Sequence, residues 1–210
     1  AIEILVVDDN SPDGTGKIVA EWSERETRIH LLAREKKMGL GPAYIAGFKW
    51  GLERDYELFI EMDADLSHRP RYLADFLKKI KQCDMVVGSR WMKGGRVANW
   101  PLSRVLLSSF AGLYCRLILG VHVADMTAGY VSYRRRVLES IPLEDVKADG
   151  YCFQIEMKYR VLQKGFKVIE TPILFTDRRV GKSKISRSIV YEAFFKVWWL
   201  RFNRNRFRMN

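Results

Sequence analysis

Cysteine and histidine are scarce in this sequence of 210 residues, which contains three of each. Cys83, Cys115 and Cys152 lie far apart, and none belongs to a CxxC pair such as a zinc finger would use. Their odd number and wide spacing exclude a disulfide scaffold and indicate a reducing compartment. Three histidines are too few for a histidine-based metal centre to be the first expectation.

Long apolar runs are also missing. The longest weakly charged stretch, residues 105–124, contains Arg116 and His122 and is interrupted by Gly112 and Gly120. A helix that spans a bilayer needs about 20 apolar residues, so we do not expect this stretch to be one. No signal peptide is visible, and the sequence opens on Ala rather than Met, so we expect that a further segment precedes it in the natural protein.

Acidic residues are outnumbered by basic ones. The sequence has 25 Asp and Glu against 36 Lys and Arg, a formal net charge of +11. This balance indicates anionic partners such as phosphates, an acidic membrane surface or nucleic acid. Proteins that bind single strands interleave exposed aromatic residues with lysines, and no such run is apparent, so we expect no nucleic acid. Apolar residues make up 48% of the chain, which is enough for the core of one domain.

Short apolar runs alternate regularly with amphipathic segments along the chain. Such alternation predicts an α/β fold with a mainly parallel, Rossmann-like sheet and flanking helices. The expected strands cover residues 3–9, 29–34, 58–63, 84–89, 130–133 and 166–175, and the expected helices cover 15–22, 42–54, 70–81, 102–119, 151–163 and a segment from 186. Thr15 is predicted as the N-cap of the first helix, and Pro42 and Pro70 suit first-turn positions.

Polar residues follow three of the expected strands. They are residues 8–10, 61–67 and 89–90. In sheets of this kind ligands bind at the carboxyl ends of the strands. We therefore expect these three sets of side chains to meet at one edge.

The sharpest local signal is a pair of carboxylates two residues apart, Asp63 and Asp65. In extended backbone they would share one face with Ser67. Hard oxygen ligands of this kind suit Mg²⁺ or Mn²⁺, so Asp63, Asp65 and Ser67 form the predicted metal site. The alternative is an ordinary acidic loop in which Asp65 or Ser67 caps the helix at Pro70. The position at a strand end, opposite a second acidic pair, favours the metal.

Asp8 and Asp9 form that second acidic pair, at the end of the first expected strand. Carboxylates accept hydrogen bonds from N–H and O–H donors, so these residues could bind the base or ribose of a nucleotide. A second metal site is less expected, because four clustered carboxylates would repel one another. The alternative is a turn into the next helix, and these residues alone do not decide between the two.

Basic residues cluster where acidic ones are absent. The two clusters are Arg90, Lys93, Arg96 and Arg104, and Arg178, Arg179, Lys182, Lys184 and Arg187. Arginine matches phosphate oxygens with two parallel hydrogen bonds. Arg90 follows a strand end and Arg104 lies near a helix start, so these two are the better phosphate candidates, whereas a solvated basic face explains Lys93, Arg96, Arg179 and Lys182 more simply.

The last segment, residues 186–210, combines aromatic and basic residues. Its large apolar residues at helical spacing are Ile189, Val190, Phe194, Val197, Trp198 and Phe202, and five basic residues but no acidic one lie from Lys196 onward. This pattern predicts an amphipathic helix in a membrane interface, with the 102–119 helix as a second candidate. The alternative is a helix packed on the domain with a basic outer face. The expected division is a domain over 1–185 and an amphipathic basic helix over 186–210.

Eight stretches carry a resemblance to a known family. They are VVDDNSPDGT, REKKMGLGPAYIAGFKWG, DADLSHRP, GSRWMKGG, NWPLSR, ADMTAGYVSYRRRVLE, GYCFQIEM and DRRVGKSKI. In order and spacing they resemble dolichol-phosphate (polyprenol-phosphate) mannose synthases, within the family 2 inverting glycosyltransferases. The resemblance covers nearly the whole chain and implies a GT-A fold over 1–185. Family members normally begin one strand and helix earlier, with a Pro-Thr-Tyr-Asn-Glu segment, so the first strand is expected to be missing here.

The resemblance also implies roles for single residues. Val7 and Asp9 would contact the guanosine of GDP-mannose, Asp63, Ala64 and Asp65 would line the nucleotide-sugar site, and Asp65 and Ser67 would take metal positions. Arg90 and Arg104 match arginines that take the lipid phosphate, with Ser108 nearby, and Arg178 and Lys184 match residues that reach the donor diphosphate. Asp125 falls where related enzymes with hydroxyl acceptors often keep a base. The expected catalytic residues are Asp65, Arg90 and Arg104, and Arg90 is also expected near the donor.

The implied reaction is metal-dependent transfer of mannose from GDP-mannose to dolichyl or polyprenyl monophosphate with inversion, giving a β-mannosyl phosphate lipid for glycosylation. The membrane surface and small membrane-anchoring subunits are further expected partners. The expected location is peripheral, on the cytoplasmic face of the endoplasmic reticulum in a eukaryote or of the plasma membrane in a prokaryote. Another family 2 transferase, with glucose or GlcNAc as sugar or a hydroxyl acceptor, is the nearest alternative, and a non-catalytic basic membrane-binding or nucleic-acid-binding module is the other.

Overall fold

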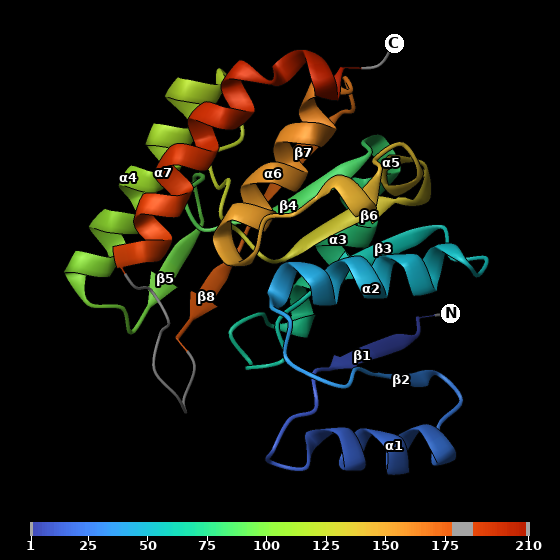
Figure 1. Ribbon diagram of the computed structural model, residues 1–210. Coiled ribbons are helices and arrows are strands. Elements are labelled where there is room, and N and C mark those ends of the chain that lie inside the picture. Colours follow the sequence, from blue (N-terminus) through green and yellow to red (C-terminus); the bar gives the residue numbers. More distant parts are fainter. Residues whose placement is uncertain (1, 178–186, 209–210) are drawn as a thin grey trace.

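Eight strands form three sheets in the computed structural model, which describes residues 2–177 and 187–208 (Figure 1). The strands are β1 (Ile4–Asp8), β2 (Ile29–Ala33), β3 (Leu58–Glu61), β4 (Met85–Ser89), β5 (Arg96–Ala98), β6 (Val131–Arg134), β7 (Val168–Pro172) and β8 (Leu174–Thr176). β1 pairs with β2, the order of the central sheet is β3-β6-β4-β7, and β5 pairs with β8.

Helices flank these sheets. They are α1 (Thr15–Arg25), α2 (Leu40–Leu52), α3 (Leu73–Lys79), α4 (Leu102–Leu119), α5 (Arg135–Glu139), α6 (Gly150–Gln163) and α7 (Arg187–Phe202), with short 3₁₀ turns η1 (Pro70–Tyr72), η2 (Ile80–Gln82), η3 (Leu143–Asp145) and η4 (Arg204–Phe207). The α/β architecture predicted from the alternating pattern is confirmed. The pattern missed β5 and α5, which are too short to show a period.

The central sheet places two strand ends beside each other. β6 lies between β3 and β4 and runs antiparallel to both, so β3 and β4 run in the same direction. β4 pairs in parallel with β7 on its other side. The segments after β3 and β4 therefore leave the sheet at the same edge, as expected. β1 belongs to a separate parallel pair with β2, which α2 contacts.

The start of α1 differs from the expectation. Its N-cap is Gly14, which has a positive φ of 81°, and Thr15 is already helical. The Thr15 hydroxyl donates to the Asp13 carboxylate at 2.6 Å, so Thr15 is not the cap and the prediction was wrong. Glycine takes this left-handed conformation without the steric cost that a Cβ would add. Pro70 opens η1, which confirms its first-turn position.

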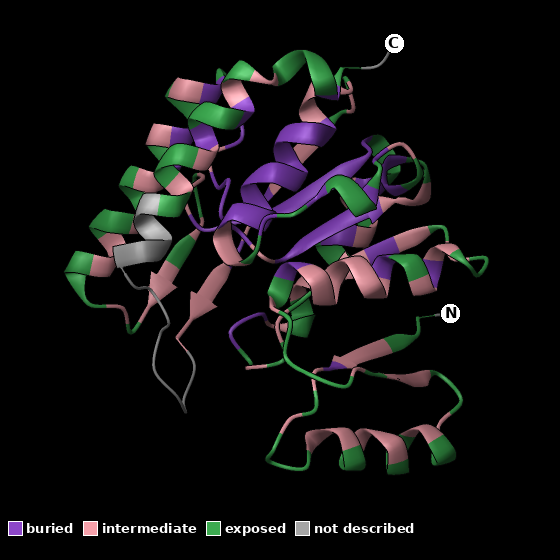
Figure 2. Ribbon diagram, in the orientation of Figure 1, coloured by how far each residue is buried: buried purple, intermediate pink, exposed green. Residues whose placement is uncertain are grey.

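The core lies around α6 and the central sheet (Figure 2). Ten consecutive residues of α6, from Cys152 to Val161, are buried, and all of β4 is buried. A smaller cluster under α3 includes Phe76, Ile80 and Tyr130. The core therefore holds the ends of β3 and β4 in a fixed position.

α7 packs on the domain beside α4 and α6 (Figure 1). Val197 and Leu200 are fully buried. The ring of Phe194 stacks on that of Tyr114 from α4, with centroids 5.3 Å apart. The assignment of Val197 to a lipid-facing side is therefore wrong, because that side chain fills the interface with the domain. The boundary at residue 185 stays a prediction, since 178–186 lie outside the described residues.

Candidate functional site

The acidic loop after β3 folds back on itself. The Asp63 backbone N–H donates to His68 Nδ1 at 3.0 Å, and the Ser67 N–H donates to Asp65 Oδ1 at 3.0 Å. Leu66 takes a positive φ of 66° at the reversal. The prediction that Asp63, Asp65 and Ser67 share one face of an extended segment is therefore wrong. The turn buries Ser67, while both carboxylates stay partly exposed.

His68 lies at the centre of the loop, and sequence analysis missed it. Its ring is buried, 5.0 Å from the Tyr130 ring centroid and 5.3 Å from that of Phe175. Burial lowers the pKa of His68 despite the nearby carboxylates, so the neutral ring is favoured. Accepting the Asp63 N–H at Nδ1 requires that the proton of the neutral ring be on Nε2. His68 therefore fixes the position of Asp63.

The two carboxylates fit the protein half of a Mg²⁺ or Mn²⁺ site. Asp63 Oδ1 accepts from the Tyr44 hydroxyl at 3.1 Å, and one third of the Asp63 side chain remains exposed. The part of the chain that the structure describes has no cluster of three or more Asp, Glu, His or Cys side chains arranged for a metal. Magnesium is commonly held by one or two carboxylates together with substrate phosphates and water. The Ser67 hydroxyl is buried and makes no hydrogen bond with the described residues, so the third predicted ligand is the least supported.

Arg90 follows β4 and is engaged by Asp125. Its Nε and Nη2 donate to the two Asp125 oxygens at 2.7 Å each, and Nη2 also donates to Thr127 Oγ1 at 2.8 Å. Burial raises the pKa of Asp125, but the charge and hydrogen bonds of Arg90, together with the charge of Lys158, outweigh burial and the net shift is downward. Asp125 is therefore an ionised partner of Arg90, and this arrangement does not suit the base that the resemblance places there.

Arg104 lies near the start of α4, in contact with Trp100. Its guanidinium carbon is 3.9 Å from the Trp100 ring centroid, and Nη1 is 2.9 Å from Asp177 Oδ2. The Arg90 guanidinium is 5.6 Å from the same ring centroid. The structure thus brings the two arginines together around one indole. Ser108 is half-buried, one helical turn after Arg104.

His68 and the arginines also belong to one cluster. The Trp100 and Phe175 ring centroids are 5.5 Å apart, and Phe175 contacts both His68 and Arg90. Asp63 and Asp65 are close enough to influence the pKa of His68. The acidic loop after β3 and Arg90 after β4 are therefore linked through His68 and Phe175, as the strand-end pattern predicted for two of its three sets, whereas Asp9 after β1 takes part in none of these contacts.

Asp9 follows β1, in the separate pair of strands, and has its own partners. It forms an ion pair with Arg34 at 2.8 Å and accepts the Met38 N–H at 3.1 Å. A cavity of about 560 Å³ adjoins Arg34 and Met38. Val7 packs near α2, where a Cβ on Gly47 would lie 3.4 Å from it. Tyr44 on the same helix contacts Asp63, so α2 links the two positions.

For three further predicted site residues the structure gives little information about their role. Ala64 is exposed in the acidic loop. Arg178 and Lys184 lie outside the described residues, so their roles at the donor diphosphate stay predictions.

Two buried ionisable residues, Lys158 and Glu61, lie close enough to influence each other's pKa. Lys158 on α6 donates to the Ala128 carbonyl at 2.6 Å and to Gln154 Oε1 at 2.9 Å. Burial lowers the pKa of Lys158 to about 8 and raises that of Glu61, at the end of β3, to about 8. No sequence signal marks this pair, because its members lie far apart in the chain.

Exposed apolar side chains lie on α4 and α7, and Figure 2 shows exposed positions along both helices. These side chains are Leu102, Leu106, Leu107, Phe110, Leu113 and Leu117 of α4, and Phe194, Phe195, Trp198, Trp199 and Phe202 of α7. Among the described helices, α4 alone is long and apolar enough to cross a membrane, judged by length and composition, so the exclusion of this stretch on that ground is not borne out. We call these eleven residues the apolar face.

Comparison with known proteins identifies the family to which this chain belongs. The family model described as "Glycosyl transferase family 2" matches residues 1–141. The chain is 50% identical over 204 residues to the polyprenol monophosphomannose synthase of Mycolicibacterium smegmatis, covering 95% of this chain and 77% of that protein. It is 46% identical over 195 residues to the undecaprenyl-phosphate mannosyltransferase of Micrococcus luteus, covering 93% and 80%.

Solved structures share the fold at lower identity. Glucosyl-3-phosphoglycerate synthase from Mycobacterium tuberculosis superposes with a TM-score of 0.59 at 19% identity, covering 96% of this chain and 68% of that one. A mannosyltransferase from Pyrobaculum calidifontis in complex with GDP-mannose and Mn²⁺ has a TM-score of 0.54 at 19% identity, covering 86% and 49%. These neighbours confirm the GT-A fold that the resemblance implied.

Proposed function

Because this chain belongs to glycosyltransferase family 2, we propose that it transfers mannose from GDP-mannose to a polyprenyl monophosphate. The observation that supports the proposal is the cluster of His68, Phe175 and Trp100, which links the acidic loop with Asp63 and Asp65 to Arg90 and Arg104. The resemblance to polyprenol-phosphate mannose synthases is confirmed by the two relatives, whose names specify a mannosyl group and a polyprenyl acceptor. The mannosyltransferase with bound GDP-mannose further supports this donor for the fold.

The donor would bind at the acidic loop. Asp63 and Asp65 would hold Mg²⁺ or Mn²⁺, which when bound neutralises the donor diphosphate and stabilises GDP as it leaves. His68 and Tyr44 keep Asp63 in place, while Val7 and Asp9 would contact the guanosine. Arg178 and Lys184 would add positive charge at the diphosphate.

The acceptor would bind at the arginines. A lipid monophosphate has a second pKa near 6, so at neutral pH it is largely dianionic and can attack without losing a proton. The attacking group therefore needs charge compensation rather than a base, which agrees with an Asp125 that is already paired with Arg90. Arg104 would contact the phosphate, with Ser108 nearby. Arg90, whose charge is compensated by Asp125, would position Trp100, on which Arg104 stacks.

Direct attack by the phosphate on the anomeric carbon would invert its configuration, giving a β-mannosyl phosphate from an α-linked donor. The C1–O bond to GDP breaks as the new C1–O bond to the lipid phosphate forms. GDP leaves with the electron pair, and preorganised cations stabilise its charge.

The apolar face would bring the site to its lipid substrate. Trp, Phe and Leu side chains on paired helices are suited to the boundary between headgroups and acyl chains, and basic residues near α7 favour anionic lipid. Arg104 lies on α4, the same helix that contributes six residues to this face. The protein would thus be peripheral on a cytoplasmic membrane surface, where small anchoring subunits could add to binding.

A donor and acceptor panel tests the proposal. Purified protein in detergent is given GDP-mannose, UDP-glucose or UDP-GlcNAc with polyprenyl phosphate, or with polyprenol as a hydroxyl acceptor. We expect product only from GDP-mannose and the phosphate, and a β-anomeric configuration by NMR. Product from another sugar would favour the other family 2 transferases, product from polyprenol would contradict the phosphate acceptor, and no turnover with any pair would favour a non-catalytic module.

A further inference from the structure

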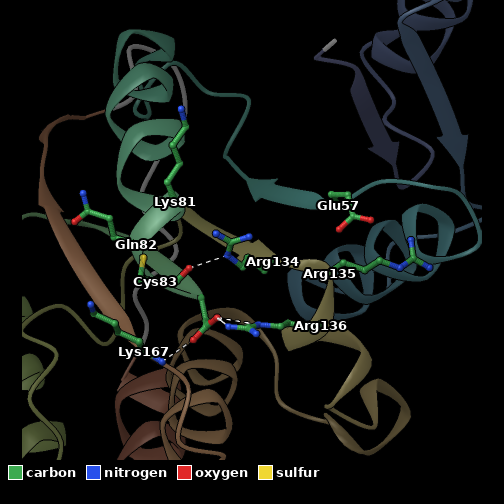
Figure 3. A pocket seen from close by; sticks show the side chains of 9 residues that line it. Glu57, Lys81, Gln82, Cys83, Arg134, Arg135, Arg136 and Lys167 are labelled. Carbon is green, nitrogen blue, oxygen red and sulfur yellow. Dashed lines mark hydrogen bonds and ion pairs between the residues drawn. The ribbon is translucent and has the colours of Figure 1, made fainter.

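A basic pocket lies at the end of the central sheet opposite to the candidate active site, and Figure 3 shows the side chains that line it. Its volume is about 500 Å³, and it is lined by Glu57, Lys81, Gln82, Cys83, Asp84, Arg134, Arg135, Arg136 and Lys167. β4 separates Asp84 in the pocket from Arg90 in the site. Six residues of extended chain correspond to about 20 Å, so the two positions cannot bind the same group.

Neutral carbonyl groups hold two of the arginines in this pocket. Arg134 donates from Nε to the Cys83 carbonyl at 2.9 Å and from Nη2 to the Ile80 carbonyl at 2.8 Å. Arg135 donates from Nη2 to the Leu52 carbonyl at 2.7 Å. Carbonyl groups fix a guanidinium without cancelling its charge. The positive charge of Arg134, which has no ion pair within the described residues, is thus held in place before any ligand arrives.

The carboxylates compensate only part of this charge. Asp84 is paired with Arg136, and it also accepts the Lys167 backbone N–H at 2.9 Å. Glu139, outside the pocket lining, pairs with Arg135 at 2.7 Å. The ammonium groups of Lys81 and Lys167 have no hydrogen bond or ion pair within the described residues. Of the five cationic lining side chains, Arg135 and Arg136 are paired with carboxylates, whereas Lys81, Arg134 and Lys167 have no ion pair among the described residues.

We propose that this pocket is a second anion-binding site, which takes a phosphate or diphosphate group independently of the active site. A pocket of this size is large for a single ion and suits a group attached to a larger molecule. Fixed arginines with nearby lysines are the combination that binds phosphate oxygens through charge-assisted hydrogen bonds. The same chemistry occurs in a soluble diphosphate and in the headgroup of an anionic lipid, so the test separates these two sources.

Pyrophosphate is the first probe, measured by calorimetry in EDTA so that metal-dependent binding at the acidic loop is removed. The variant is Lys81→Gln with Lys167→Gln, both exposed side chains whose loss leaves the observed hydrogen bonds intact. The matched control, Lys17→Gln with Arg25→Gln, removes the same charge from exposed positions on α1. We expect the pocket variant to bind at least about tenfold more weakly and the control to bind like wild type, since charge-assisted hydrogen bonds are the stronger class.

NMR of the full chain locates the binding. Pyrophosphate should shift the amide signals of Asp84, Arg136 and Lys167, and leave those of Asp63 and Asp65 unchanged. Equal affinity of wild type and pocket variant, or shifts confined to the acidic loop, would overturn the proposal.

Vesicle flotation then identifies the source of the ligand. If the site takes a lipid headgroup, the pocket variant floats less with phosphatidic acid vesicles, and pyrophosphate competes with wild-type flotation. If it takes a soluble phosphate, flotation is unchanged while pyrophosphate binding is still lost. Both results support the site, whereas a loss of flotation without any loss of pyrophosphate binding contradicts it.

Discussion

Helices α6 and α4 differ in which residues they bury: α6 buries charged side chains, whereas α4 exposes apolar ones. α6 carries Glu156, Lys158 and Arg160, yet all three are buried. α4 is rich in leucine, yet Leu102, Leu106 and Leu117 are more than 60% exposed. Buried charge is costly unless it is paired, and a large exposed apolar surface usually marks an interaction site. The difference indicates that α6 supports the site from within the core, whereas α4 exposes its apolar side to an interaction partner.

The largest effect, a loss of folding stability, is expected for a substitution in α6. Glu156 accepts from Arg160 at 2.6 Å and pairs with Lys196 of α7 at 2.7 Å, so it joins the two helices. Glu156→Gln leaves two cations without their counter-charge and should lower the free energy of unfolding by about 3–5 kcal/mol, measured by urea denaturation.

The molecule contains a matched control for this change. Arg135 and Glu139 form a pair at the same i,i+4 spacing, but half of the Glu139 side chain is exposed. Glu139→Gln should cost less than about 1 kcal/mol, because solvent screens exposed pairs. Equal losses in the two variants would remove the distinction between buried and exposed charge.

The next effect concerns the exposed side of α4. Leu106→Asp with Phe110→Asp should abolish flotation with vesicles, because each apolar side chain contributes about 1.5–3 kcal/mol when buried. Folding stability should change little, since both side chains are more than 60% exposed in the structure. Leu119→Ala on the same helix is the contrast: it is buried, so it should lower stability by about 2–5 kcal/mol and leave flotation of the folded protein intact. A double variant that unfolds, or that still floats, would contradict the interfacial role of α4.

A smaller effect is expected at Arg104, which lies near the start of α4. Arg104→Lys keeps the charge but loses the planar fork and its stacking on Trp100. The KM for polyprenyl phosphate should rise about tenfold, as expected for a loss of about 1.4 kcal/mol, with GDP-mannose binding little changed. Weaker GDP binding instead would assign Arg104 to the donor phosphates.

The smallest effect, on vesicle binding, is expected for Arg204, which follows α7 in the chain. Arg204 is exposed in η4, and Arg204→Gln should weaken binding to anionic vesicles by about 1 kcal/mol. High salt should reduce the difference between variant and wild type, since it screens surface charge. Equal binding of the two proteins to anionic vesicles at low salt would show that this residue does not face the membrane.

The sequence predicted α4 correctly because its ends carry local signals. Pro101 precedes the helix and Gly120, with a φ of 68°, ends it, so the predicted range 102–119 is confirmed. The α/β class was predicted correctly because the alternation of apolar runs with amphipathic segments is also visible in the local sequence. The placement of β6 between β3 and β4 depends on pairing between distant segments, which no local pattern encodes.

The candidate site was predictable only in part. Its position followed from the polar residues after strands, and the structure links the acidic loop with Asp63 and Asp65 to Arg90 and Arg104 through His68, Phe175 and Trp100. The turn at Leu66 and the pairing of Arg90 with Asp125 were not predictable. The first depends on a single positive φ, and the second joins residues 35 positions apart. The burial of the charged residues of α6, and therefore their partners, was not predicted, because charged residues normally lie at the surface.

Metal-dependent turnover by wild type and Asp65→Ala tests the proposed function most directly. Both proteins are given GDP-mannose and polyprenyl phosphate, first in EDTA and then with Mn²⁺, with Asp55→Ala as a control on an exposed loop. The account predicts that wild type and Asp55→Ala are inactive in EDTA and active with Mn²⁺. Asp65→Ala should fold normally and lose at least about a hundredfold in rate, as expected when charge stabilisation of the leaving group is removed. Turnover by Asp65→Ala that still depends on Mn²⁺ and approaches the wild-type rate would contradict it.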